Sequence, residues 1–399
     1  MWFNANHLRY KKPILIKNLH GYVLPHAGTE FTGSIISHTL RFRPLKKINK
    51  IIIFYYPASI EPDVTSTEPG VTAKYYHEYY VPWQSLVTIL GKDYNYIGYN
   101  IRQAKIPPLN LKDALLVVSA DFSHFLPFHN AIDLENKAAR ALMFKELLYG
   151  QVVDDLRTFK VLFDRIPRVW QLQWVGRERS PGVKAVGYLS FLLRETLTRP
   201  ASNRKTTIDG LFVTVYSNDM VARECQGIWF SSTKKWSFLE ENKLISEVID
   251  LGETTSRLTG GLHLVKPLTH YTITYLYKDT VNPFIRGWHG IQQHAFYLPD
   301  VLLEHTFPNG KWITPNDKDW PVGENEFVLS ETLQQLNVKA GLVGGKGFAG
   351  NKINRSVKKS PKRQKTCKLN GGKLNGGKLN GFANSPYSLY SSHVAHYTL

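Results

Sequence analysis

Cysteine is scarce in this chain, since Cys225 and Cys367 are the only two in 399 residues. Cys367 lies among lysines, glycines and asparagines that cannot hold a fixed geometry, so we expect no structural disulfide. The chain also has no uncharged run of about 18 apolar residues, which argues against a membrane-spanning helix. Its first residues lack the apolar segment of a signal peptide. These absences predict an intracellular protein, cytoplasmic or nuclear, with no membrane partner.

Acidic residues are missing from Val343 to Leu399, a stretch that holds 11 lysines and arginines. It therefore supplies 11 of the net charge of +18, and the preceding residues carry only +7. The stretch repeats KLNGG, KLNGG and KLNG, with too little apolar surface to fold. We expect residues 343–399 to form a disordered basic tail. This tail would bind nucleic acid or another polyanion non-specifically, or extend into solvent with no partner. The sequence does not identify any protein partner.

The rest of the chain is rich enough in apolar residues to build hydrophobic cores, because 43% of the sequence is apolar and 13% aromatic. Its length favours two domains. The polar stretch Thr198–Lys205 has the composition of a linker. We therefore predict one domain over residues 15–200 and a second over residues 205–342.

The first predicted domain alternates strand-like and helix-like segments. Lys50–Tyr56 and Leu115–Ser119 are short apolar runs that predict buried strands. Asp133–Tyr149 has apolar residues at helical spacing, with Asp133 as a candidate N-cap. Val183–Leu197 is a second helix candidate. This alternation is typical of an α/β sheet.

The second predicted domain has the pattern of an α+β fold. Gly210–Tyr216 and Thr269–Tyr277 are rich in β-branched and aromatic residues, which predicts two strands. Trp236–Leu251 and Leu329–Leu336 are expected to be helices.

Two polar turns follow strand-like segments of the first domain. One contains His26, and the other contains Asp121 and His124 in the sequence SADFSH. Sheets of this class place ligand sites at the carboxyl ends of their strands. Imidazole and carboxylate groups suit either metal binding or acid/base chemistry. On spacing alone, histidines hydrogen-bonded within their own loops are the simpler interpretation.

These motifs resemble, in their order, those of the Memo family. The matching segments are PHAG around His26, EYYVP from Glu78, and SADFSHF around Asp121 and His124. The resemblance implies an α/β fold similar to that of the LigB-type non-haem iron extradiol dioxygenases. It also implies a metal-binding role for His26, a carboxylate in the metal pocket at Asp121 and a base-like position at His124.

The chain departs from the Memo pattern at several expected ligand positions. The turn YPAS from Tyr56 stands where the family has Gly-Pro-Ser-His, so the second histidine is absent. KYY from Lys74 replaces Glu-His-Ser, and VGR from Val175 replaces Cys-Gly-Arg. Because a non-haem iron site needs about three protein ligands, we expect an incomplete site with weak affinity for iron or copper and no resident cofactor. Tight binding would require another residue, such as His77 or His38, at the vacant position.

The second domain resembles the AMMECR family through several segments in the family's order. These begin at Gly210 (GLFVTVY), Arg223 (RECQG), Lys266 (KPLT), Trp288 (WHGI), Tyr297 (YLPDV) and Lys339 (KAGL). The resemblance implies a fold but no established reaction. It also connects the chain to the AmmeMemoRadiSam grouping, in which AMMECR, Memo and radical-SAM proteins occur together.

Cys225 is the candidate nucleophile of the second domain. The guanidinium of Arg223 would favour its thiolate, whereas the carboxylate of Glu224 would oppose it. The alternative is a small, partly buried apolar side chain, as free cysteine usually is. The candidate catalytic residues are therefore Cys225, Arg223 and His124.

The missing family ligands favour a non-catalytic scaffold or binding protein with a degenerate metal pocket. Two alternatives remain open. One is a metal- or cysteine-dependent enzyme, and the other is a nucleic-acid binder that acts through the basic tail.

Overall fold

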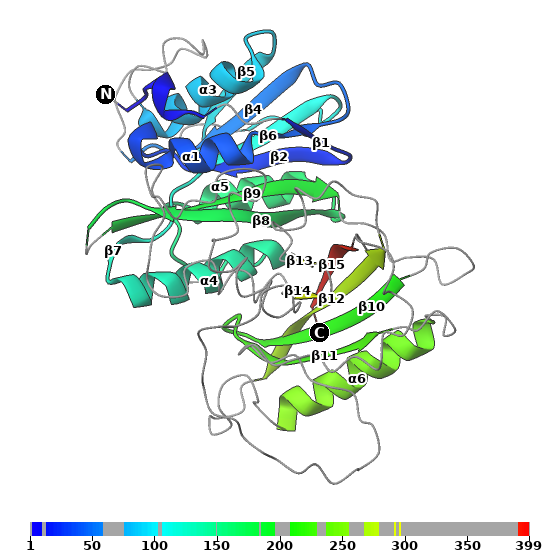
Figure 1. The fold of residues 1–399 in the computed structure, drawn as a ribbon. Helices are drawn as coiled ribbons and strands as arrows, with labels where there is room; N and C mark the ends of the chain where they lie inside the picture. The colour runs from blue at the N-terminus through cyan, green and yellow to red at the C-terminus, as the bar shows by residue number, and fades with distance from the viewer. Residues whose placement is uncertain are drawn as a thin grey trace, which may run out of the picture. The chain divides into compact units, whose positions relative to one another are not determined.

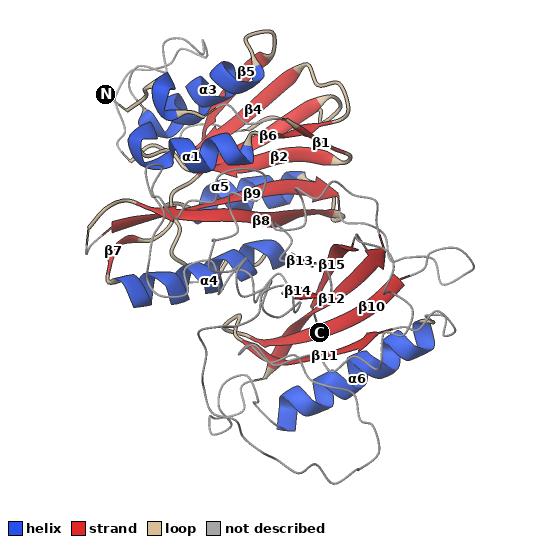
Figure 2. Ribbon diagram, viewed as in Figure 1, coloured by secondary structure: helices blue, strands red, loops and turns tan. Residues whose placement is uncertain are grey.

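A computed structural model describes residues 2–9, 13–58, 76–102, 106–148, 150–182, 185–195, 208–229, 237–254, 267–278, 291–292, 295–296 and 390–398. The chain combines α-helices with multi-stranded sheets, as predicted (Figures 1 and 2). It divides into two compact units between Glu195 and Ile208. The described residues up to Glu195 are called the first unit below, and those from Ile208 the second unit. The predicted linker Thr198–Lys205 and helix Leu329–Leu336 lie outside the described residues.

The first unit is built on a mixed sheet with the strand order β5-β4-β6-β2-β9-β7, in which β8 also pairs with β9. Four neighbouring strands are parallel: β5 (Asn95–Asn100), β4 (Lys50–Tyr55), β6 (Ala114–Ser119) and β2 (Leu19–Leu24). β9 (Ala185–Glu195) runs antiparallel to β2, to β7 (His124–Leu126) and to β8 (Trp170–Arg179). The carboxyl ends of the four parallel strands therefore share one edge of the sheet.

Continuous apolar sequence explains the central strands. All of β6 (ALLVVS) is buried, and so is β4 (KIIIFY) after its first residue. Strands that are covered on both faces have this composition, and the predictions for Lys50–Tyr56 and Leu115–Ser119 are confirmed. α3 (His77–Leu90) and α5 (Leu156–Arg165) both pack against β4 and β6.

The remaining elements of the first unit surround this sheet. α1 (Thr29–Thr39) packs against β8, β9 and α3, and α4 (Phe128–Phe144) packs against β8 and β9. The short helix η1 (Ala5–His7) contacts α1. β1 (Ile14–Ile16) and β3 (Phe42–Pro44) form a separate parallel pair.

Two helix predictions in the first unit need correction. The helix expected over Asp133–Tyr149 is α4, which begins earlier, after Pro127, and ends at the left-handed residue Lys145. Asp133 lies inside this helix and forms an ion pair with Lys137 instead of capping it. The helix expected over Val183–Leu197 is wrong, because this segment contains the buried strand β9. A long apolar run fits a buried strand and a buried helix equally well when periodicity is the only guide.

The second unit contains a four-stranded antiparallel sheet with the order β11-β10-β12-β15. Its strands are β10 (Ile208–Ser217), β11 (Ala222–Trp229), β12 (Leu268–Lys278) and β15 (Tyr390–Thr398). α6 (Phe238–Thr254) packs on this sheet through a core that includes Val213, Val248 and Ile273. β13 (Ile291–Gln292) and β14 (Ala295–Phe296) pair with each other. The three predicted elements Gly210–Tyr216, Thr269–Tyr277 and Trp236–Leu251 are thus confirmed.

The prediction that residues 343–399 are disordered is wrong for β15. This strand pairs with β12 over its whole length, from Thr398 opposite His270 to Tyr390 opposite Lys278. Its sequence, YSSHVAHYT, has no lysine or arginine and is rich in residues that favour strands. The composition of the basic repeats therefore does not extend to the end of the chain. Residues 343–389 lie outside the described part.

Within the described residues, no helix is both long and apolar enough to cross a membrane.

Candidate functional site

His26 and Asp121 meet at the carboxyl edge of the parallel strands. His26 follows β2 and Asp121 follows β6, and these strands are parallel neighbours. The backbone N–H of His26 donates to Asp121 Oδ1 at 2.9 Å. The structure thus brings together two of the residues that the sequence proposed for the site.

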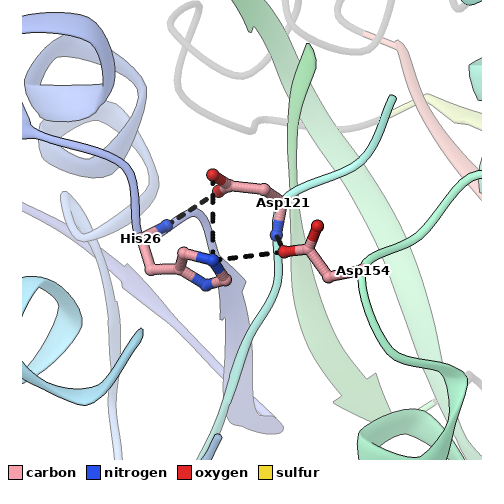
Figure 3. Close-up of side chains that lie close together, drawn as sticks. All are labelled: His26, Asp121 and Asp154. Carbon is pink, nitrogen blue, oxygen red and sulfur yellow. Dashed lines mark hydrogen bonds and ion pairs between the residues drawn. The ribbon is translucent and has the colours of Figure 1, made fainter. Parts of the chain in front are cut away.

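Asp154 completes this arrangement, although sequence reasoning did not identify it. Its Oδ2 lies 3.2 Å from His26 Nε2, and Asp121 Oδ2 lies 3.8 Å from the same nitrogen. Asp121 donates its backbone N–H to Asp154 Oδ2 at 2.7 Å, and Asp154 donates its own to the Asp121 carbonyl at 3.1 Å. Figure 3 shows both carboxylates turned toward the imidazole ring. His26, Asp121 and Asp154 are called the histidine–aspartate cluster below.

His124 borders the cluster on its more exposed side. Its Nε2 lies 3.2 Å from Asp154 Oδ1, and its side chain is 41% exposed. The Phe122 carbonyl lies 2.9 Å from His124 Nδ1. Because a carbonyl can only accept, this contact assigns the Nδ1 proton and directs Nε2 toward Asp154. The structure therefore places the third predicted residue beside the cluster as well.

A second fixed contact orients the ring of His26. The Ser119 hydroxyl donates to the Glu78 carbonyl, so its oxygen is left to accept from His26 Nδ1 at 3.0 Å. His26 Nε2 then faces Asp121 and Asp154. Such outer contacts, which fix the tautomer of a histidine, are typical of metal ligands.

The charges of the cluster perturb one another strongly. Burial would lower the pKa of His26, but the carboxylates of Asp121 and Asp154 outweigh it and raise this pKa to about 9. Burial raises the pKa of Asp121 to about 6 against the opposing charge of His26. Burial would raise the pKa of Asp154, but the hydrogen bond to His26 and the charge of His26 outweigh burial and lower this pKa. A cation that displaced the His26 proton would find two carboxylate groups beside Nε2.

The other residues considered for the vacant ligand position have different contacts. His77 Nδ1 lies 3.3 Å from Glu78 Oε2, and its ring stands edge-on to His26 with 5.3 Å between centroids. His38 lies within α1, where its ring contacts Phe42. Glu78 Oε1 accepts the backbone N–H of Ala58 at 2.9 Å. Glu78 therefore secures the turn after β4.

A buried ion network supports the loop that carries Asp121 and His124. Glu135 Oε2 lies 3.3 Å from Arg177 Nε, Glu135 Oε1 lies 3.2 Å from Arg179 Nη1, and all three side chains are at most 2% exposed. The Ser123 hydroxyl donates to Glu135 Oε1. Arg177, which stands in the VGR segment, is thus part of the structural support. Two backbone hydrogen bonds also join Gly187 to this loop. The Phe122 N–H donates to the Gly187 carbonyl, and the Gly187 N–H donates to the Ser123 carbonyl.

Cys225 and Arg223 lie on strand β11 of the second unit, whereas the histidine–aspartate cluster belongs to the first unit. Both are buried, at 3% and 4% exposure, and the register of β11 with β10 shifts at Arg223. Glu224 Oε1 accepts the backbone N–H of Cys225 at 3.2 Å. His124 belongs to the first unit, so the three predicted catalytic residues are divided between the two units. The burial of Cys225 fits the alternative of a small apolar side chain.

Alkylation of Cys225 should be slow, because reaction needs an exposed thiolate. The measurement is iodoacetamide labelling against pH in a variant with Cys367→Ser. We expect a rate midpoint at or above about 8.5, the ordinary thiol pKa, and much faster labelling in denaturant. A midpoint well below about 7 would instead identify an activated nucleophile.

Comparison with known proteins adds no family assignment. No protein-family model matches this chain, and no curated protein sequence matches it. The resemblances to the Memo and AMMECR families therefore stay predictions, and the function has to be argued from the geometry of the site.

Proposed function

We propose that the first unit binds a divalent transition-metal ion through His26, Asp121 and Asp154, with His124 at the more exposed side. The observation that carries this proposal is the convergence of one imidazole and two carboxylates, whose ligand atoms all lie within 4.8 Å of one another. Nitrogen and oxygen ligands bind such ions at about 2.0–2.2 Å, which places neighbouring ligand atoms roughly 3 Å apart. The separations of 3.2 and 3.8 Å around His26 Nε2 fit this requirement.

The donor set favours iron or another metal that accepts imidazole and carboxylate together. A bound ion would supply Lewis acidity toward an oxygen-containing ligand. The chain itself would hold the ion with His26 and the two aspartates. It would also place His124 Nε2, the base-like position that the Memo resemblance implies, beside Asp154.

This proposal revises the expectation of an incomplete site, since Asp154 offers a third ligand in place of the absent second histidine. It favours the metal-dependent alternative over a non-catalytic scaffold for the first unit. The cysteine-dependent alternative loses support because Cys225 is buried.

Metal titration of the full-length protein tests the proposal. Metal-free protein should take up one Fe(II) or Co(II) per chain and retain it through gel filtration. Asp154→Asn should weaken the affinity by more than about 100-fold, which is the upper range for loss of an outer contact alone. Asp164→Asn, which removes an exposed acid of α5 that is paired with Lys160, is the matched control and should leave affinity unchanged. Equal affinity in the Asp154→Asn variant, or no stoichiometric uptake by the natural chain, would contradict the proposal.

A further inference from the structure

Two arginines contact one tyrosine ring beside the histidine–aspartate cluster. The guanidinium carbon of Arg157 lies 3.9 Å from the ring centroid of Tyr56, and that of Arg102 lies 4.5 Å from it. Tyr56 directly follows β4, Arg102 follows β5, and Arg157 lies in the first turn of α5. Three separate elements thus bring two cations to one aromatic side chain.

The strand order places this group at the same sheet edge as the cluster. β5, β4, β6 and β2 are parallel neighbours, so Tyr56 and Asp121 follow adjacent strands. Neighbouring strands are about 4.8 Å apart. Asp154 immediately precedes the N-cap residue Asp155 of α5, and Arg157 lies two residues after Asp155. A ligand of a few atoms could therefore reach from the arginines to the cluster.

Among the described side chains, Asp155 forms an ion pair with Arg157, and none forms one with Arg102. Asp155 Oδ1 accepts from Arg157 Nε at 2.8 Å. For Arg102, the hydrogen bond to Asn100 comes from its backbone N–H, and its buried Nε has no hydrogen-bond partner in the described part of the chain. A guanidinium has five N–H donors, so both arginines retain donors for a ligand.

The α5 helix begins beside these arginines. Asp155 caps its N-terminus by accepting the Thr158 N–H, so the two arginines, and not the helix end, would bind an anion. Guanidinium groups stack on aromatic rings and bind carboxylate or phosphate through paired N–H donors. Contact with the Tyr56 ring limits the motion of both guanidinium groups at this edge of the sheet.

We propose that Tyr56, Arg102 and Arg157 form a binding site for the oxyanion group, phosphate or carboxylate, of a small substrate. The rest of that substrate would reach the histidine–aspartate cluster, and this second part rests on the proposed metal function. The substrate expected at this site is therefore a small anionic molecule.

Anion titration of the metal-free, full-length protein tests the first part. Inorganic phosphate and acetate are the two probes, and the tighter one identifies a tetrahedral or a planar group. We expect saturable binding of one anion per chain, weakened at least about tenfold by Arg102→Met and by Arg157→Met, since hydrogen bonds to charged groups are strong. Lys160→Met is the matched control, because it removes an exposed α5 cation paired with Asp164, and it should leave affinity within about twofold.

Two outcomes would overturn the proposal: no saturable binding of either anion, or equal affinity in the two arginine variants and the Lys160→Met control. Thermal unfolding of each variant identifies any loss of affinity that comes from misfolding, and Arg102→Lys then replaces a misfolded Arg102→Met. Asp154→Asn separates the two functions, because it should weaken metal binding by more than about 100-fold and leave phosphate binding to metal-free protein intact. Tighter phosphate binding after metal loading, lost in Asp154→Asn, would support a ligand that spans both sites.

Discussion

Glu135→Ala should destabilise the first unit by about 3–5 kcal/mol, the range for removal of one partner from a buried ion pair. Glu135 is fully buried between Arg177 and Arg179. Burial raises the pKa of Glu135 and lowers that of Arg177 to about 10, so both charges already bear a desolvation cost. Without the carboxylate, two buried guanidinium groups would lie close together with no counter-charge from Glu135.

Urea unfolding of the first unit measures this effect. Asp133→Ala is the matched control on the same helix, because Asp133 forms an ion pair with Lys137 at 2.8 Å and its side chain is 65% exposed. Exposed pairs contribute about 0.2–1 kcal/mol. A loss below about 1 kcal/mol in Glu135→Ala would show that water reaches the arginines and that the network is not the support of the loop.

The same substitution should also weaken metal binding at the cluster. Ser123 connects Glu135 to the loop between Asp121 and His124, and loss of an outer contact typically costs 10–100-fold in metal affinity. Ser123→Ala removes this connection and retains the ion pairs. It should therefore affect metal affinity more than stability.

Local patterns in the sequence predicted the strands that short apolar runs define. Lys50–Tyr55 and Ala114–Ser119 are too short for typical buried helices, so their type was clear. β9 was misassigned because its 11 residues are long enough for either structure. Its pairing with β2 and β8 decides the outcome, and a local pattern does not contain that information.

The residues of the candidate site could also be predicted only in part from the sequence. His26, Asp121 and His124 stand in recognisable turns after strands, so the sequence indicated them. Asp154 lies 33 residues beyond Asp121, and its only local signal is an acidic pair before a helix, which is also the pattern of an ordinary N-cap. β15 is a different case, because its own residues favour a strand but follow a basic repeat segment whose composition predicts disorder.

Replacing the 11 lysines and arginines between Lys346 and Lys378 with glutamine should remove most of the affinity of the chain for nucleic acid. These residues supply 11 of the net charge of +18, with no acidic residue among them. If about 6–10 phosphates are contacted, affinity of the natural chain should fall by roughly 10³–10⁵ between 50 and 200 mM salt. Binding should not depend on base sequence, because phosphate contacts carry no sequence information.

Charge replacement is a sharper test than truncation. Ending the chain at Leu342 would also remove β15 and uncover the edge of β12, which changes the sheet of the second unit. Substitution of Asn370, Asn375 and Asn380 with serine is the matched control, since it alters all three repeats and keeps every charge. Fluorescence anisotropy with two unrelated DNA sequences over a salt series measures affinity, salt slope and sequence dependence together. Equal affinity in the charge-free variant would place the binding surface on the folded units, whose net charge is only +7. If affinity falls steeply with salt in the natural chain and this dependence disappears with the 11 charges, nucleic-acid binding belongs to the basic segment before β15.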